Sequence, residues 1–180
     1  MNDESASARF RSIVLSNLDA AHNLAWWLTR NEHDAADVVQ DACVKAWRFF
    51  GDFRGEGGVG GADGKAWLLR IVRTTAATIR RGSRERPISL EAAGADTAGP
   101  ERRPDPGASM ALATNALAVN EAIESLPEPL REILILRDVE GLSYAQIATV
   151  LEAPPGTVMS RLSRARDALR DAMLARGAKE

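Results

Sequence analysis

The spacing of apolar residues along the chain predicts helices and no strands. In the first half, apolar side chains recur every three or four positions in three segments, which is the period of a helix that buries one face. We therefore expect helices at residues 9–30, 34–50 and 65–81, with Trp47 on the apolar, buried side of the second. No segment alternates apolar and polar side chains over the length of a strand, so the pattern predicts an all-α fold.

The second half continues the helical pattern in shorter pieces. Its apolar spacing predicts helices at about 109–126 and 129–139. Pro127 separates the two, because the residue before a proline disfavours the helical conformation, and Pro129 is a favourable first helical residue. Gly141 then ends the second of these helices.

Two further helices near the end of the sequence have the layout of a helix-turn-helix. Ser143 and Gln146 match the capping box S-x-x-Q, which predicts a helix at 144–151. The pair Pro154-Pro155 forces a turn before a last helix at about 157–175. Two short helices joined by a tight turn and preceded by a supporting helix are typical of this motif.

Two segments lack helical periodicity. Residues 51–64 contain too many glycines for regular structure, and residues 82–107 are dominated by Pro, Gly, Ala and charged side chains. We therefore predict two small helical domains joined by a flexible linker. The first is a helical bundle at 1–86, the linker covers 87–108, and the helix-turn-helix domain covers 109–180.

Charge divides the chain into basic, acidic and basic parts, although its net charge is only -2. Residues 1–86 hold thirteen Lys and Arg against eleven Asp and Glu, 87–155 hold four against eleven, and 156–180 hold six against three. Two basic parts around an acidic middle suit a protein that contacts a polyanion at two places.

Composition argues against several other classes of protein. A single cysteine, Cys43, and two histidines, His22 and His33, cannot furnish a closed zinc site, and Cys43 lies on an apolar helix face that favours packing over redox sensing. No nucleophile motif is present, and the G-x-G-x-x-G at 55–60 follows no predicted strand. We expect no enzyme activity, no metal and no cofactor. The apolar stretches are too short for a membrane span and the first residues lack a signal pattern, so we expect a cytoplasmic protein without membrane insertion.

The second helix of the helix-turn-helix would present a polar face to DNA. Val158 and Leu162 are four residues apart and would pack on Ile147 and Leu151. In this motif the second helix enters the major groove, where Arg binds guanine or phosphate and hydroxyl groups bind the backbone. The alternative is a solvated helix face whose arginines pair with nearby aspartates. The outward residues are Thr157, Met159, Ser160, Arg161, Ser163 and Arg164.

The same residues carry a family resemblance. GLSYAQIATVLEAPPGTVMSRLSRARDALR resembles region 4 of the extracytoplasmic-function (ECF) sigma factors, the small promoter-specificity subunits of bacterial RNA polymerase, and SLPEPLREILILRDVEGLS fits the segment before it. DAADVVQDACVKAWR resembles their region 2.2, and DGKAWLLRIVRTTAATIRR resembles regions 2.3 and 2.4. The resemblance covers about residues 9–86 and 110–174.

The resemblance assigns roles to residues of the first domain. Region 2.2 would dock on the clamp helices of the largest polymerase subunit, although its polar face could also be simply solvated, with Asp near a helix N-terminus. The glycine-rich loop would capture a base flipped out of the melted minus-ten element, or could be a surface insertion. The polymerase-binding residues would be Asp37, Gln40, Asp41 and Arg48. The minus-ten residues would be Phe53, Arg54, Arg70, Arg73, Thr74, Thr78, Arg80 and Arg81.

In the second domain, the resemblance implies duplex recognition of the minus-thirty-five element, and a contact with the polymerase flap. The residues would be Thr157, Met159, Ser160, Arg161, Ser163, Arg164 and Arg166. The chain departs from the family pattern at several positions. Thr74 stands where Asn is common, Thr78 where an acid is common, and Met159 where a basic residue is common. Glu152 stands where Gly often ends the first helix, which costs about 1 kcal/mol if the site is left-handed.

The resemblance implies a sigma subunit that binds RNA polymerase core, recognises both promoter elements and directs initiation of a stress or envelope-response regulon. Its partners would be core polymerase, promoter DNA and an anti-sigma factor, and in the holoenzyme it would be associated with the nucleoid. The alternative is a stand-alone helix-turn-helix regulator whose N-terminal bundle dimerises or senses a ligand, which would bind palindromic sites.

Overall fold

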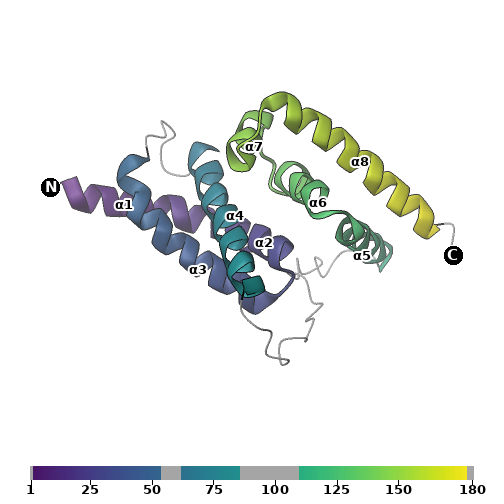
Figure 1. Cartoon of the computed structure of the whole chain (residues 1–180), viewed down its shortest axis with the longest axis horizontal. Helices are drawn as coiled ribbons and strands as arrows, with labels where there is room; N and C mark the ends of the chain where they lie inside the picture. The colour runs from purple at the N-terminus through teal and green to yellow at the C-terminus, as the bar shows by residue number, and fades with distance from the viewer. Residues whose placement is uncertain (1, 54–61, 86–109, 178–180) are drawn as a thin grey trace.

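The computed structural model describes residues 2–53, 62–85 and 110–177, and it confirms the expected all-α fold. Every regular element in these three ranges is helical (Figure 1). The predicted linker at 87–108 lies outside the described residues. The first module contains α1 (Asn2–Ser16), α2 (Leu18–Thr29), α3 (Glu32–Phe49), the 3-10 turn η1 (Phe50–Asp52) and α4 (Ala62–Glu85). The second contains α5 (Met110–Ser125), α6 (Glu128–Leu134), the π-helix η2 (Ile135–Val139), α7 (Tyr144–Leu151) and α8 (Pro155–Gly177).

The single helix expected at 9–30 is interrupted at Asn17, so that prediction was wrong in part. Asn17 has φ -123° and ψ 12°, outside the helical region, and separates α1 from α2. Its buried side chain donates a hydrogen bond of 2.8 Å from Nδ2 to the carbonyl of Ile13. An asparagine side chain competes in this way for the backbone groups of a helix. The apolar stripe continues across the break, so periodicity does not reveal it.

The N-terminal module is a bundle in which α2, α3 and α4 pack on one another. Its core includes Leu24, Trp26, Val38 and Leu68, all essentially removed from solvent. The helix expected at 34–50 begins slightly earlier, where the side chain of Asn31 caps α3 by accepting the Asp34 amide at 2.9 Å.

α1 approaches α4 at a glycine. A Cβ added to Gly64 would lie 3.0 Å from Cγ2 of Ile13, closer than side chains normally approach. The glycine in the first turn of α4 therefore allows α1 to approach α4 closely at Ile13.

The C-terminal module confirms the predicted helix-turn-helix. Ser143 and Gln146 form both hydrogen bonds of the capping box at the start of α7. Val158 and Leu162 of α8 are buried together with Ile147. Glu152, which ends α7, has φ 52° and ψ 42°. It therefore adopts the left-handed conformation expected at a position where the family often has glycine.

The predicted helix at 129–139 contains a π-turn that its sequence does not reveal. The amide of Glu140 bonds to the carbonyl of Ile135, five residues before it, at 2.8 Å. Gly141 then adopts φ 70°, and the Leu142 amide bonds to the Leu136 carbonyl at 3.0 Å. The backbone thereby turns from η2 into the helix-turn-helix.

The two modules lie against each other along their helices (Figure 1). α4 packs on α7, while α2 packs on α6 and η2, and the buried apolar residues of both modules form one cluster. α8 lies on the side of the C-terminal module that is remote from α3 (Figure 1).

We expect replacement of Ser143 by Ala to lower the free energy of unfolding by about 1 kcal/mol, because the first turn of α7 loses its side-chain acceptor. Urea denaturation followed by circular dichroism measures the change. Thr149→Ala is the matched control, because it removes an exposed hydroxyl that bonds only within the same helix. Equal stability of the Ser143→Ala variant and the wild type would contradict a role for the capping box.

Candidate nucleic-acid interface

Three arginines lie along one face of α4, at positions 70, 73 and 80, because residues three and seven apart share a helix face. Each of them meets a carboxylate of the C-terminal module. Arg73 Nε lies 2.7 Å from Glu132 Oε1, and Arg80 Nη1 lies 2.5 Å from Glu128 Oε2. Arg70 pairs with Glu152. The structure thus brings these three predicted minus-ten residues together, with acidic partners that the sequence did not indicate.

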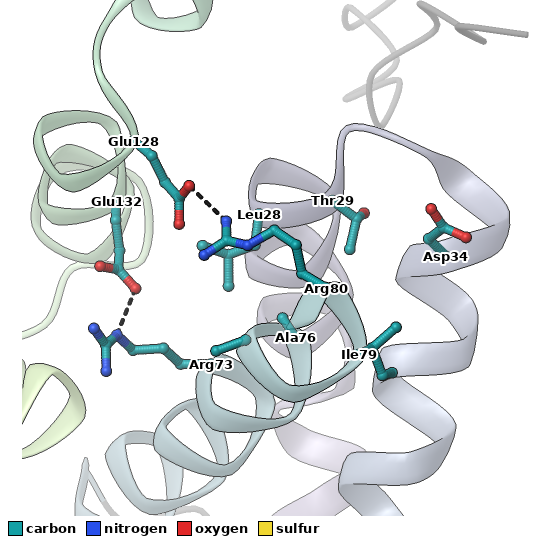
Figure 2. Close-up of a pocket in the computed structure, with 10 residues that line it drawn as sticks. Leu28, Thr29, Asp34, Arg73, Ala76, Ile79, Arg80, Glu128 and Glu132 are labelled. Carbon is teal, nitrogen blue, oxygen red and sulfur yellow. Dashed lines mark hydrogen bonds and ion pairs between the residues drawn. The ribbon is translucent and has the colours of Figure 1, made fainter. Parts of the chain in front are cut away.

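A pocket lies between the two modules beside these pairs. Figure 2 shows Arg73 and Arg80 of α4 reaching across it to Glu132 and Glu128 of α6. Its opposite wall includes Leu28 and Thr29 at the end of α2. The lining is therefore partly apolar and partly ionic, and both modules contribute to it.

The carboxylate of Glu132 is buried, with 7% of its side chain exposed. Burial raises the pKa of Glu132, and the charge and hydrogen bond of Arg73 oppose this rise without cancelling it. Arg161 of α8 also lowers the pKa of Glu132 through its charge. Two predicted DNA-binding arginines, one from each module, therefore act on one buried acid.

The remaining predicted residues of α4 are exposed on its outer side. Thr74 Oγ1 donates to the Arg70 carbonyl at 3.1 Å, and Thr78 Oγ1 donates to the Thr74 carbonyl at 2.9 Å. Arg81 Nε bonds weakly to the Ala77 carbonyl at 3.3 Å. Both threonine hydroxyls thus satisfy their own helix, and they offer DNA only acceptor oxygens in this arrangement.

Phe53, at the start of the glycine-rich loop, belongs to an aromatic cluster. Its ring lies 4.7 Å from that of Trp67 and stacks at 6.0 Å on Phe50. A groove lined by Phe53, Trp67 and Arg70 runs from here to Gln146 of α7. Trp67 is thus a neighbour of the predicted base-capture residue. Arg54, predicted for the same role, lies outside the described residues.

The outer face of α8 agrees in large part with the prediction. Met159, Ser160, Ser163 and Arg164 are exposed, whereas Thr157 and Arg161 are half-buried. Arg166 departs from this set, because its Nη2 lies 2.8 Å from Asp138 Oδ1 on η2. This hydrogen bond raises the pKa of Arg166 above its already high value.

The predicted polymerase-binding residues share the solvent face of α3. Asp37, Gln40, Asp41 and Arg48 are all exposed. The face also carries two apolar side chains that the sequence analysis did not place there, Val44 at 48% and Trp47 at 50% exposure. Trp47 was expected on the buried side of α3, and that prediction was wrong. The buried line is made by the small residues Ala35, Ala42 and Ala46 with Val38 and Val39, and the larger side chains lie beside it.

Three further questions about the described residues concern metal ligands, membrane-spanning helices and a reactive cysteine. In these ranges no group of three His, Cys, Asp or Glu side chains could hold a metal ion. Within the same ranges no helix is both long and apolar enough to cross a membrane. Cys43 is half-buried, and burial raises the pKa of its thiol.

Comparisons with known proteins decide the family. Residues 13–86 match the family described as "Sigma-70 region 2", and residues 116–169 match "Sigma-70, region 4". The chain is 37% identical to the RNA polymerase sigma-H factor of Pseudomonas aeruginosa over 178 residues, which cover 91% of this chain and 86% of that protein. The chain belongs to the sigma-70 family. The ECF RNA polymerase sigma-E factor of Escherichia coli K12 is also 37% identical, over 76% of this sigma factor and 72% of its relative.

Solved structures extend the comparison to the arrangement of the modules. The sigma factor RpoE of Bartonella quintana, crystallised with the anti-sigma factor NepR, is 26% identical, with a TM-score of 0.66 over 91% of this chain and 96% of that one. CnrH, solved with the cytosolic domain of CnrY, is 25% identical, with a TM-score of 0.61 over 92% and 88% of the two chains. The resemblance to ECF sigma factors is therefore confirmed in sequence and in fold.

We expect the Glu132→Gln variant to keep more of its stability than the wild type as pH rises. The pKa of Glu132 is higher in the folded than in the unfolded protein, so the unfolded state ionises first and gains stability as pH rises above the ordinary glutamate value of about 4.3. Urea unfolding at a series of pH values measures the difference between the two proteins.

Glu121→Gln is the control for this series, because Glu121 is an exposed carboxylate that pairs with Arg176 within the C-terminal module. If the wild type and the Glu132→Gln variant differ in unfolding free energy by the same amount at every pH, the buried carboxylate does not titrate as described.

Proposed function

We propose that this sigma factor binds RNA polymerase core and places two of its helices on promoter DNA. The observation that supports this most directly is that α4 and α8, one in each family region, carry the arginines predicted to contact DNA. A stand-alone regulator does not account for the N-terminal half, which matches sigma region 2. The proposed activity is recognition and melting of DNA, with no covalent reaction by the chain itself.

The proposed domain division follows the family matches. Residues 1–86 form the region 2 domain, 87–108 the linker, and 109–180 the region 4 domain. In the first domain, α4 holds the melted minus-ten strand, because arginines follow phosphates along a single strand and aromatic rings stack on bases. Arg70, Arg73 and Arg80 bind the phosphates. The rings of Phe53 and Trp67 form the surface on which bases stack.

The region 4 domain reads the minus-thirty-five duplex through α8. Met159, Ser160, Ser163 and Arg164 are exposed on the helix that follows the turn, where this motif meets base edges and phosphates. Arg161 and Thr157 lie at the edge of this surface. Arg166, held by Asp138, belongs to its far end and contacts DNA only if that pair opens.

The polymerase docks on the exposed face of α3 and, by its flap, on the region 4 domain. Asp37, Gln40, Asp41 and Arg48 supply polar contacts, and Val44 and Trp47 add apolar area of the kind that carries binding energy in interfaces. An anti-sigma factor is a further proposed partner, supported by the anti-sigma complex of the B. quintana relative. The protein would work in the cytoplasm, where polymerase meets the chromosome, on a stress or envelope-response regulon.

We expect transcription in vitro from genomic promoter fragments only when this protein is added to bacterial core polymerase that lacks its own sigma subunits. Arg161→Ala should lower initiation, because loss of an arginine that contacts a base or phosphate costs about 1–3 kcal/mol. Asp41→Ala should lower initiation by weakening the affinity for core polymerase, which is measured separately by competition with a labelled sigma subunit.

Two matched controls accompany these variants. Arg170→Ala removes an exposed arginine farther along α8 that pairs with Asp167, and Asp19→Ala removes an exposed acid on α2. Both should initiate like the wild type. Absence of initiation together with tight binding of the free protein to duplex DNA would instead favour a stand-alone regulator.

A further inference from the structure

The ion pairs between the modules all have the same polarity within the described residues. The cation belongs to the N-terminal module and the carboxylate to the C-terminal module. Arg30 lies 2.6 Å from Glu124, and Lys65 lies 2.9 Å from Glu140, in addition to the three arginine pairs of α4. We call the two sets the basic face (Arg30, Lys65, Arg70, Arg73 and Arg80) and the acidic face (Glu124, Glu128, Glu132, Glu140 and Glu152).

The basic face includes the arginines of α4 that would bind single-stranded DNA. A guanidinium binds carboxylate and phosphate oxygens with the same donor groups and similar geometry. A carboxylate that holds Arg73 or Arg80 therefore stands where a DNA phosphate would otherwise be bound. The acidic face and a melted promoter strand cannot occupy these arginines at the same time.

Glu140 anchors the acidic face beside the π-turn. Its carboxylate accepts hydrogen bonds from Lys65 and, at 2.6 Å, from Nδ2 of Asn23, and its own backbone carbonyl accepts from Lys65 Nζ at 2.8 Å. Its side chain is 8% exposed. The contact thus holds both α2 and α4 of the N-terminal module.

Glu152, another residue of the acidic face, has a strained backbone. It is a residue other than glycine with φ 52°, a conformation that favours glycine, and its side chain pairs with Arg70. Glycine would relieve the strain and would remove the carboxylate. The residue present therefore supplies a contact to the other module at some cost to its own helix end.

The contact contains weak and replaceable parts. The pairs of Arg70 with Glu152 and of Arg80 with Glu128 leave each side chain roughly half exposed, where water and salt weaken ion pairs. The pair of the partly exposed Arg73 with the buried Glu132 gains only what remains after the carboxylate loses its water. A polyanion or a large protein surface can therefore displace the acidic face.

We propose that the acidic face is an internal substitute for DNA, which covers the single-strand-binding face of α4 in the free protein and leaves it when polymerase separates the modules. The proposal rests on the proposed function of α4. The occupant of this surface of α4 is the C-terminal module of the same chain.

The test uses the full chain without polymerase. The triple variant Glu128→Gln, Glu132→Gln and Glu152→Gln removes three carboxylates while keeping side-chain size. Binding to a fluorescein-labelled single-stranded DNA of mixed sequence is measured by anisotropy, and the radius of gyration by small-angle X-ray scattering. We expect the variant to bind DNA about threefold to tenfold more tightly and to have a larger radius of gyration.

A matched triple variant controls for charge alone. Glu121→Gln, Asp167→Asn and Asp171→Asn change the net charge by the same amount at exposed carboxylates of the C-terminal module that lie outside the acidic face. Equal tightening in both triple variants would mean that net charge explains the effect, and the proposal would be overturned. An unchanged radius of gyration and unchanged affinity in the first variant would overturn it as well.

Glu152→Gly provides a second opening variant that relieves the positive φ. We expect tighter single-strand binding from it without any loss of α7 helicity, and no tightening would count against the proposal.

Transcription assays separate this proposal from the proposed function. If the wild type directs initiation but the acidic-face variants neither open nor bind single strands more tightly, only the internal substitute is wrong. If no form of the protein directs initiation with core polymerase, the proposed function itself fails.

Discussion

The ion pair between Arg73 and Glu132 constrains which faces of the two modules meet, in addition to the apolar cluster that the modules share. A carboxylate buried as deeply as that of Glu132 is costly unless a cation is held beside it, and the nearest cation belongs to the other module. This geometry explains why the middle of the sequence is acidic. Its carboxylates face the basic helix α4, so the alternation of charge along the chain becomes complementarity between two surfaces in space.

Much of the fold could be predicted from the sequence because the signals that specify a helix lie within the helix and at its ends. Apolar period, proline positions and the capping box at Ser143 located the helices from α3 onward to within a few residues, whereas α1 and α2 were predicted as one helix. The misses have physical causes. The break at Asn17 depends on one side-chain hydrogen bond, and the π-turn before Glu140 keeps the same apolar face inward. The exposure of Trp47 follows from small alanines that already fill the buried line of α3.

The candidate site was predictable as a set of faces and less so as a set of contacts. Residue spacing placed Arg70, Arg73 and Arg80 on one side of α4, and family resemblance gave that side a partner. Neither the spacing nor the resemblance could show that carboxylates distant in sequence pair with those arginines, because such pairing depends on how the modules meet. The contact of Trp67 with Phe53 could not be predicted for the same reason, since helix α4 and the segment after α3 meet only in the folded bundle.

The π-turn of η2 makes the chain sensitive to length at one place. A π-turn is an α-helix with one residue inserted, and each residue of an α-helix advances the side chains by about 100° around the axis. Deletion of one residue between Ile135 and Val139 would leave composition and hydrophobicity almost unchanged. It would nevertheless rotate Glu140 away from Lys65 and Asn23 and swing the helix-turn-helix that follows. Lineages of this chain should therefore accept substitutions here far more readily than a change of one residue in length.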